Sequence, residues 1–502
     1  MIDKSDLDKK YEKLLNTDHL QKDLGKRSVR SSFVTLASSG SNFFLTMLST
    51  MVLARLITPA DFGLFAMVSM FTSFLSIFKN LGLGMATIRK PVLTHGEVTN
   101  VFWVNNFVSA ALALIIIVMA PGVAWFYDDA RLTLITVAVA AGFIVSGLGI
   151  QHNSLLRRQM RFTELAGVNI SSLMVGIFSG ISAAYLGATY WSLVILQFVT
   201  VFTNTSLCWF LCKWRPGLPR RDVNVREMVF FGGNLTGSRI IGYFNLNLGN
   251  ILIGRYVGAA SLGFFDKANQ LLHMPVHQFS FPVGSVAIPA LSSLQSTPDR
   301  FRSYYRYAVF FIGLIAFPLV FVLVIFAEEV VLIVLGSQWN EVTPIFRLLA
   351  PASVIGILSV ALRWTYISLG RANKQLRWGI VDCFFNFLFL GIGIQFGVLG
   401  VAVAFSAKAL LLILPETLYC FKGTFITVSD LLKPLIYSIT YAAMACGAVW
   451  YLKIDLDLQW NPLVLCIVGG IVYLFLYLLL YTALPPSRKI LIENLKKLKA
   501  NL

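Results

Sequence analysis

The sequence ILIGRYVGAASLGFFDKANQ, at residues 251–270, repeats the pattern of VLARLITPADFGLFA at residues 52–66. Each stretch runs from apolar residues into a single arginine, continues through a short turn, and ends on a Gly-Leu-Phe or Gly-Phe-Phe step that opens a new apolar segment. The arginines, Arg55 and Arg255, lie 200 positions apart. A duplication on the scale of half a chain, with ionisable residues near the joint, is typical of membrane transporters.

The composition places most of the chain in a membrane. Of its 502 residues, 57% are hydrophobic and only 13% are charged, with a mean hydropathy of +0.74. Soluble proteins carry about 25% charged residues. The net charge of +17 does not indicate nucleic-acid binding, because the basic residues lie in short loops between apolar runs. The positive-inside rule for membrane proteins accounts for them better.

Apolar runs of about 20 residues, the length that crosses a bilayer, recur along the chain. They predict an all-α polytopic membrane protein with fourteen transmembrane helices. The predicted spans are residues 32–54, 62–85, 98–122, 132–151, 165–187, 189–211, 228–253, 262–291, 304–327, 343–369, 378–396, 399–421, 434–452 and 462–484.

The repeat extends beyond its best-matched stretch. SLLRRQMRF, after the fourth span, resembles SLGRANKQLRW, after the tenth. We therefore expect two pseudo-symmetric six-helix bundles in the same orientation, followed by two additional helices. The predicted domains are a cytoplasmic basic N-terminal segment (1–30), an N-terminal bundle (31–212), a cytoplasmic linker (213–227), a C-terminal bundle (228–422), two further transmembrane helices (433–485) and a basic tail (486–502).

Lysine and arginine gather in alternate connecting segments, and both ends of the chain are among them. This asymmetry predicts that both termini are cytoplasmic. The N-terminal segment alternates basic residues with leucines and lacks the apolar core of a signal peptide. Two interpretations remain for it, a helix lying on the anionic membrane surface and a solvated tail.

Ionisable residues inside the predicted spans are the candidate functional residues, because a charge at membrane depth is costly and normally faces a bundle interior or a wet cavity. Cations there would attract a phosphate or pyrophosphate, and carboxylates would tune the cavity or take up H⁺ or Na⁺. The alternative is that they pair with one another. The candidate cations are Lys79, Arg239, Lys267, Arg363 and Lys408, and the candidate acids are Asp266, Asp382 and Glu416. Asp266 and Lys267 are adjacent, which places them on different helix faces and weakens pairing between them.

Several classes of activity are not expected. The sequence has no Walker loop for ATP hydrolysis, and its six cysteines lie in apolar runs without histidines at ligand spacing, so no metal or cofactor is predicted. A polymerase or ligase would need a sizeable outer loop, and the segments at 328–341 and 453–462 are too short to form one. A cation-coupled multidrug exporter stays an alternative, although the surplus of buried cations favours an anionic substrate.

Three stretches together resemble a known group of proteins. ARLITPADFGLFA (54–66), GFFDKANQLLHMPV (263–276) and VGSVAIPALSSL (283–294) are similar to the Wzx-type polysaccharide flippases of the multidrug/oligosaccharidyl-lipid/polysaccharide superfamily. Within that group, the likeness is to the subgroup exporting colanic- or teichuronic-acid-type repeat units. It covers the chain from about residue 30 to residue 485.

The resemblance implies a bacterial inner-membrane protein, and not an enzyme, that moves an undecaprenyl-pyrophosphate-linked oligosaccharide from the cytoplasmic to the periplasmic leaflet by alternating access. It further implies a role in exopolysaccharide, capsule or lipopolysaccharide synthesis, and contacts with a polysaccharide polymerase and a chain-length regulator. Relatives that flip the peptidoglycan lipid precursor carry an acid–base pair matched here by Asp266 and Lys267, and an aspartate matched by Asp61.

Overall fold

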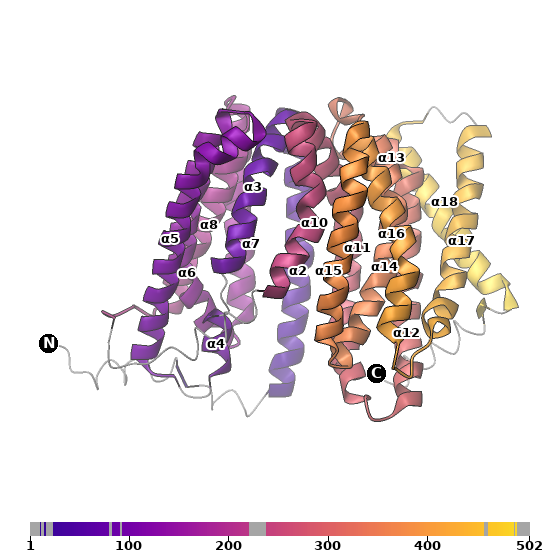
Figure 1. Ribbon diagram of the computed structural model, residues 1–502, viewed down its shortest axis with the longest axis horizontal. Coiled ribbons are helices and arrows are strands. Elements are labelled where there is room, and N and C mark those ends of the chain that lie inside the picture. The colour runs from indigo at the N-terminus through magenta and orange to yellow at the C-terminus, as the bar shows by residue number, and fades with distance from the viewer. Residues whose placement is uncertain are drawn as a thin grey trace. The chain divides into compact units, whose positions relative to one another are not determined.

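The structure of the chain is a computed structural model (Figure 1). It describes residues 11, 15–16, 24–79, 83–90, 93–219, 237–455, 460–485 and 487–488. All regular secondary structure in these residues is helical, which confirms the predicted all-α class. The chain divides into two compact units. Unit 1 comprises Met1–Asn247 with Gly258–Gly263, and unit 2 comprises Leu248–Val257 with Phe264–Leu502.

Unit 1 is a bundle of long helices joined by short turns. Within it α5 packs on α6, α7 on α8, α6 on α8, and α2 on α7. Its helices are α2 (Leu24–Leu56), α3 (Pro59–Lys79), α4 (Leu83–Arg89), α5 (His95–Tyr127), α6 (Arg131–Arg158), α7 (Phe162–Tyr185) and α8 (Trp191–Cys212). A further helix, α10 (Gly237–Tyr256), begins in unit 1 and ends in unit 2.

Unit 2 is also a bundle of long helices, and it includes two further helices near the C-terminus, α17 and α18. Here α14 packs on α16, α15 on α16, and α12 on α17. Its elements are α11 (Ala259–Ser293), α12 (Pro298–Ile325), α13 (Ala327–Val334), the 3₁₀ turn η2 (Ser337–Trp339), α14 (Val342–Ser368), α15 (Ala372–Gly393), the 3₁₀ turn η3 (Ile394–Phe396), α16 (Gly397–Phe421), α17 (Val428–Asp455) and α18 (Pro462–Ala483).

A long helix lies at each of the fourteen predicted spans. Eleven described segments are long and apolar enough to cross a membrane, and one of them, residues 372–421, contains both α15 and α16. The described parts of α10 and α11 are not among these eleven candidate membrane spans, because asparagines, glutamines and charged residues lower their mean hydropathy. The chain is therefore a multi-pass membrane protein, while fourteen crossings stays a prediction.

The two copies of the repeated motif meet within unit 1. The backbone at Gly63 on α3 packs against the carbonyl of Ala259, and the backbone at Gly263 packs against the carbonyl of Pro59. A Cβ atom would lie 1.8 Å from the first oxygen and 2.1 Å from the second, so neither position accepts a side chain. Each glycine touches the residue four positions before the other. The contact is therefore reciprocal, and the sequence repeat has a structural counterpart.

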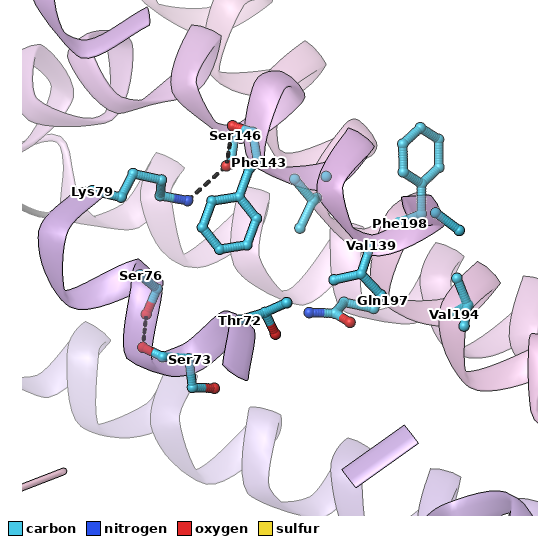
Figure 2. A pocket seen from close by; sticks show the side chains of 13 residues that line it. Thr72, Ser73, Ser76, Lys79, Val139, Phe143, Ser146, Val194, Gln197 and Phe198 are labelled. Atoms are coloured by element: carbon cyan, nitrogen blue, oxygen red, sulfur yellow. Dashed lines mark hydrogen bonds between the residues drawn. The ribbon is translucent and has the colours of Figure 1, made fainter. Parts of the chain in front are cut away.

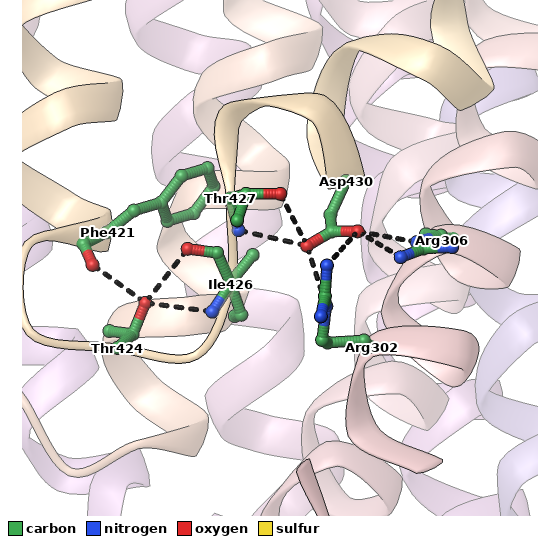
Figure 3. A network of polar contacts seen from close by, with 7 residues as sticks. All are labelled: Arg302, Arg306, Phe421, Thr424, Ile426, Thr427 and Asp430. Carbon is green, nitrogen blue, oxygen red and sulfur yellow. Dashed lines mark hydrogen bonds and ion pairs between the residues drawn. The ribbon is translucent and has the colours of Figure 1, made fainter. Parts of the chain in front are cut away.

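In unit 2, a buried carboxylate fastens the first of the additional helices, α17, to α12 (Figure 3). Asp430 is 1% exposed. Its oxygens accept hydrogen bonds from the Thr427 backbone N–H and Oγ1, each at 2.9 Å, which caps α17. The carboxylate also accepts from Arg302 Nε at 3.0 Å and Arg306 Nε at 2.6 Å. The two arginines are four residues apart and therefore share one face of α12.

We expect Asp430→Asn to destabilise unit 2 by about 1–3 kcal/mol, because the amide leaves donors of both arginines and the cap without a charged acceptor. The effect stays in this range because both arginines are partly exposed and remain hydrated. The measurement is the Tm of the purified protein in detergent. The matched control is Asp299→Asn, an exposed acid in the first turn of α12, which should leave the Tm unchanged. Equal Tm values for the two variants would contradict this account of α17.

Candidate functional site

Unit 1 contains a partly polar cavity of about 200 Å³ lined by α3, α6 and α8 (Figure 2). Its walls include apolar side chains such as Phe143 and Phe198. The polar groups that line it are a lysine, four hydroxyls and an amide, from Lys79, Thr72, Ser73, Ser76, Ser146 and Gln197. A cavity of this kind inside a membrane bundle provides the hydrogen-bonding and charged groups that hydrocarbon lacks.

Lys79 is the cation of this cavity and the last residue of α3. Its Nζ donates a hydrogen bond to Ser146 Oγ at 2.6 Å and lies 5.1 Å from the centroid of the Phe143 ring. Ser146 Oγ in turn donates to the Phe143 carbonyl at 2.9 Å. The ammonium is therefore held by a hydroxyl and an aromatic face, and neither of these cancels its charge.

The sequence of α3 explains how these groups reach one cavity. Thr72, Ser76 and Lys79 are spaced four and three residues apart, so they share one face of a mostly apolar helix. Of these residues, only the lysine was predicted from the sequence as a site residue. The hydroxyls at i and i+4, followed by the lysine at i+7, were a readable signal for the polar face. Ser146 and Gln197 had no such signal, because tertiary packing brings them in from other helices.

Asp61, which the resemblance matched to a functional aspartate, caps α3 in this structure. Its Oδ2 accepts hydrogen bonds from the Thr58 backbone N–H at 3.0 Å and from Thr58 Oγ1 at 2.7 Å. Its own backbone N–H donates to Thr58 Oγ1 at 3.3 Å. This reciprocal arrangement is a capping box, whose loss typically costs about 1 kcal/mol. Asp61 therefore has a structural task at the start of the helix that carries Lys79.

In unit 2 three candidate residues gather on α15 and α16. Lys408, 7% exposed, places its Nζ 2.9 Å from Asp382 Oδ1. Glu416, two turns further along α16, accepts a hydrogen bond from Ser359 Oγ of α14 at 3.3 Å. Asp382 is thus neutralised by a cation of the chain itself, whereas the bond that the structure shows at Glu416 comes from a neutral hydroxyl.

The remaining candidates occupy three separate places. Asp266 Oδ2 and Lys267 Nζ are 3.8 Å apart, so these neighbours pair although their adjacency was expected to weaken pairing. The long lysine side chain folds back to its neighbour and also donates to Gln270 Oε1 at 2.8 Å. Arg363 is exposed on α14. Arg239 lies on α10, and its side chain is outside the described part of the structure.

We expect Lys408→Met to lower stability by about 1–3 kcal/mol, because it strands the partly buried carboxylate of Asp382. The double variant Lys408→Met/Asp382→Asn should regain most of that loss, since it removes the second charge as well. Thermal unfolding of the two single variants and the double variant in detergent measures this coupling. Additive losses in the double variant would show that the pair does not interact.

The cavity of unit 1 can bind one part of an anionic molecule and form hydrogen bonds to its hydroxyl groups. Its volume lies below the range of about 300–1,000 Å³ that is usual for small-molecule pockets, so it would hold one part of a large molecule. A phosphate against Lys79, with sugar hydroxyls against serine, threonine and glutamine, matches the chemistry of the walls.

Sequence comparison assigns the family. Residues 52–344 match the model of the family described as "Polysaccharide biosynthesis protein". The chain belongs to this family. The match covers more than half of its length, including the cavity of unit 1 and the repeated motif.

Relatives with curated names share low identity over long stretches. The chain is 25% identical over 309 residues to the teichuronic acid biosynthesis protein TuaB of Bacillus subtilis, covering 61% of this chain and 64% of TuaB, which is just under two thirds. It is 21% identical over 368 residues to the lipopolysaccharide biosynthesis protein WzxC of Escherichia coli, covering 72% and 74%. It is 24% identical over 362 residues to the succinoglycan biosynthesis transport protein ExoT of Rhizobium meliloti, covering 69% and 73%.

Among solved structures, the inward closed conformation of the lipid II flippase MurJ has a TM-score of 0.72 to this chain, covering 92% of it and 100% of MurJ. At 12% sequence identity this likeness shows the fold alone. The likeness extends over nearly the whole chain and agrees with the predicted all-α fold.

Proposed function

We propose that the chain translocates an undecaprenyl-pyrophosphate-linked oligosaccharide from the cytoplasmic to the periplasmic leaflet of the bacterial inner membrane. Family membership and the roles named for TuaB, WzxC and ExoT support polysaccharide synthesis as the process. The observation that carries the proposal is the cavity of unit 1, where Lys79 stands among hydroxyls inside a membrane bundle.

The physical task fits the walls of this cavity. A pyrophosphate bearing sugars cannot enter hydrocarbon without losing its hydration. An ammonium group and several hydroxyls replace that water with fixed partners, and they are most effective where the surroundings are apolar. The lipid tail has no need of the cavity, because it can stay in the bilayer. Turnover would follow alternating access, as duplicated transporters commonly do.

Coupling to H⁺ or Na⁺ is part of this proposal, and Glu416 is the best candidate for it. Asp382 already faces the ammonium of Lys408, so an incoming cation would have to displace a covalently tethered one. Asp266 has Lys267 within 3.8 Å. Glu416 accepts from a serine hydroxyl, which can also orient toward a bound ion.

We also propose a membrane orientation and partners for the protein. Both termini would be cytoplasmic, as the distribution of lysine and arginine predicts. A polysaccharide polymerase and a chain-length regulator would act on the translocated unit as partners. The chain would act as a transporter and not as an enzyme, with no cofactor and no nucleic-acid partner.

A leaflet assay in cells tests the function. In a deletion strain that carries an empty vector, lipid-linked oligosaccharide should accumulate with its sugars on the cytoplasmic side. Expression of the wild-type chain from the same vector should clear it. Normal surface polysaccharide in the deletion strain, with no accumulated intermediate, would reject the flippase and favour the multidrug exporter.

A further inference from the structure

Described residues of the basic N-terminal segment do not line the cavity, yet they are packed into unit 1. Ahead of α2 the structure describes Tyr11, Leu15 and Asn16, and all three contact the helices of the bundle. Tyr11 and Leu15 are 7% and 4% exposed. They belong to the same buried cluster as Phe102 and Trp214. Of the two interpretations of this segment, neither a membrane-surface helix nor a solvated tail would bury these side chains in the protein.

Tyr11 occupies a defined binding position on α5. Its ring stacks on the His95 imidazole, with centroids 5.1 Å apart and planes inclined by 15°. His95 lies at the start of α5, and its Nδ1 accepts a hydrogen bond from Trp214 Nε1 at 3.1 Å. Trp214 itself is fully buried. Tyr11 therefore rests on a ring that the core already holds in place.

Two backbone carbonyls complete the attachment. Leu15 O accepts from Arg158 Nε, and Asn16 O accepts from Gln159 Nε2, each at 3.2 Å. Arg158 ends α6 and is 5% exposed. A buried guanidinium with its five donors in a fixed fork can serve several carbonyls at once.

The same guanidinium reaches the segment that follows α3. Arg158 Nη1 donates to Thr87 O at 3.0 Å and to Ile88 O at 3.2 Å, at the C-terminal end of α4. Carbonyls at the end of a helix attract a positive charge. Because α3 ends at Lys79 and α4 is the next helix in the chain, one side chain connects the N-terminal segment to the helix that follows the cavity cation.

We propose that Tyr11, Leu15 and Asn16 are the docked part of an intramolecular strap that, through Arg158, fixes α4 and thereby positions Lys79 for transport. Tyr11, Leu15 and Arg158 are positioning residues, since they act through α4 and do not line the cavity. The transport part of this inference rests on the proposed function, whereas the docking of the strap can be tested without it.

Two native thiols report the docking. Cys208 and Cys212 are 1% exposed in the cluster that Tyr11 and Leu15 help to cover. Labelling by a maleimide in inside-out vesicles measures access to this pair. Tyr11→Ala/Leu15→Ala should speed labelling by about tenfold or more, because the rate follows the population of the opened state. Tyr11→Phe keeps the stacking ring and should label close to the parent rate. The parent for these measurements has its other four cysteines replaced by alanine, at Cys383, Cys420, Cys446 and Cys466.

The matched control is Leu218→Ala, which truncates an 82% exposed leucine and should change neither labelling nor transport. If the double variant does not accumulate, Tyr11→Ala alone provides the milder test. Unchanged labelling in the alanine variants would overturn the strap.

The second measurement is of transport: the rate of translocation and the apparent affinity for lipid-linked oligosaccharide. The alanine variants should translocate several-fold more slowly, with Tyr11→Phe restoring most of the parent rate. Faster labelling with unchanged transport would overturn the positioning role. Failure of the parent chain itself to translocate this substrate would reject the proposed function, and the labelling result would still decide whether the strap exists.

Discussion

Replacing Lys79 by methionine should slow translocation of lipid-linked oligosaccharide by about 10- to 100-fold, because a charge-assisted contact contributes about 1.5–3 kcal/mol. Methionine has nearly the length of lysine and fills the same space, so the cavity between α3, α6 and α8 should keep its shape. The lysine ammonium is the positive charge that the structure shows among the cavity walls. The measurement is the initial rate of translocation, with protein level and Tm determined in parallel.

Two further variants separate charge from packing at this position. Lys79→Arg keeps the charge and should retain most of the rate. Ser146→Ala removes the hydroxyl that accepts the 2.6 Å hydrogen bond from Lys79 and should cost only a few-fold, because the charge remains. A rate for Lys79→Met equal to that of Lys79→Arg would show that the charge of Lys79 takes no part in transport.

Gly63→Ala should be strongly destabilising, although it adds a single methyl group. The new Cβ would lie 1.8 Å from the Ala259 carbonyl oxygen. Both sides of this contact are backbone, so no side chain can rotate away, and overpacking of this kind costs about 1–3 kcal/mol or more. We expect a lowered Tm and reduced transport, and the reciprocal variant Gly263→Ala should behave alike because its Cβ would meet the Pro59 oxygen at 2.1 Å.

Gly122→Ala is the matched control for this prediction. Gly122 is also helical, on α5, and a Cβ there would meet open space. Alanine is the better helix former, so this variant should be neutral or slightly stabilising. If Gly63→Ala and Gly122→Ala had the same Tm, the close contact between the two repeat copies would not exist in the protein.

The positions of the helices could be predicted from the sequence for a physical reason, and the family could be predicted from its motifs. A membrane span needs about 20 apolar residues in a row, and this requirement is local and easy to recognise. The structure accordingly has a long helix at each predicted span. The motif shared by residues 52–66 and 251–270 is also present in the fold, where Gly63 and Gly263 make equivalent close contacts.

The partners of the charged residues could not be predicted in the same way. Lys408 and Asp382 meet from neighbouring helices although they are 26 positions apart in the chain, and only packing decides which side chains face each other. Asp61 is a different case, because Thr58 three residues before it is a readable capping signal. The cavity could be predicted only in part. Its polar residues on α3 recur at helical spacing, whereas Ser146 and Gln197 belong to no such pattern.

The most direct test of the central claim uses purified protein in liposomes that contain a lipid-linked oligosaccharide with a labelled sugar. A membrane-impermeant glycosidase then cleaves only the sugars exposed on the outside. With the wild-type chain, the inner-leaflet pool should become cleavable at a rate well above that of protein-free liposomes, and the Lys79→Met chain should fall toward the protein-free rate. A labelled neutral lipid without phosphate or sugar should stay protected in all samples. Equal rates for wild type, Lys79→Met and protein-free liposomes would contradict the account.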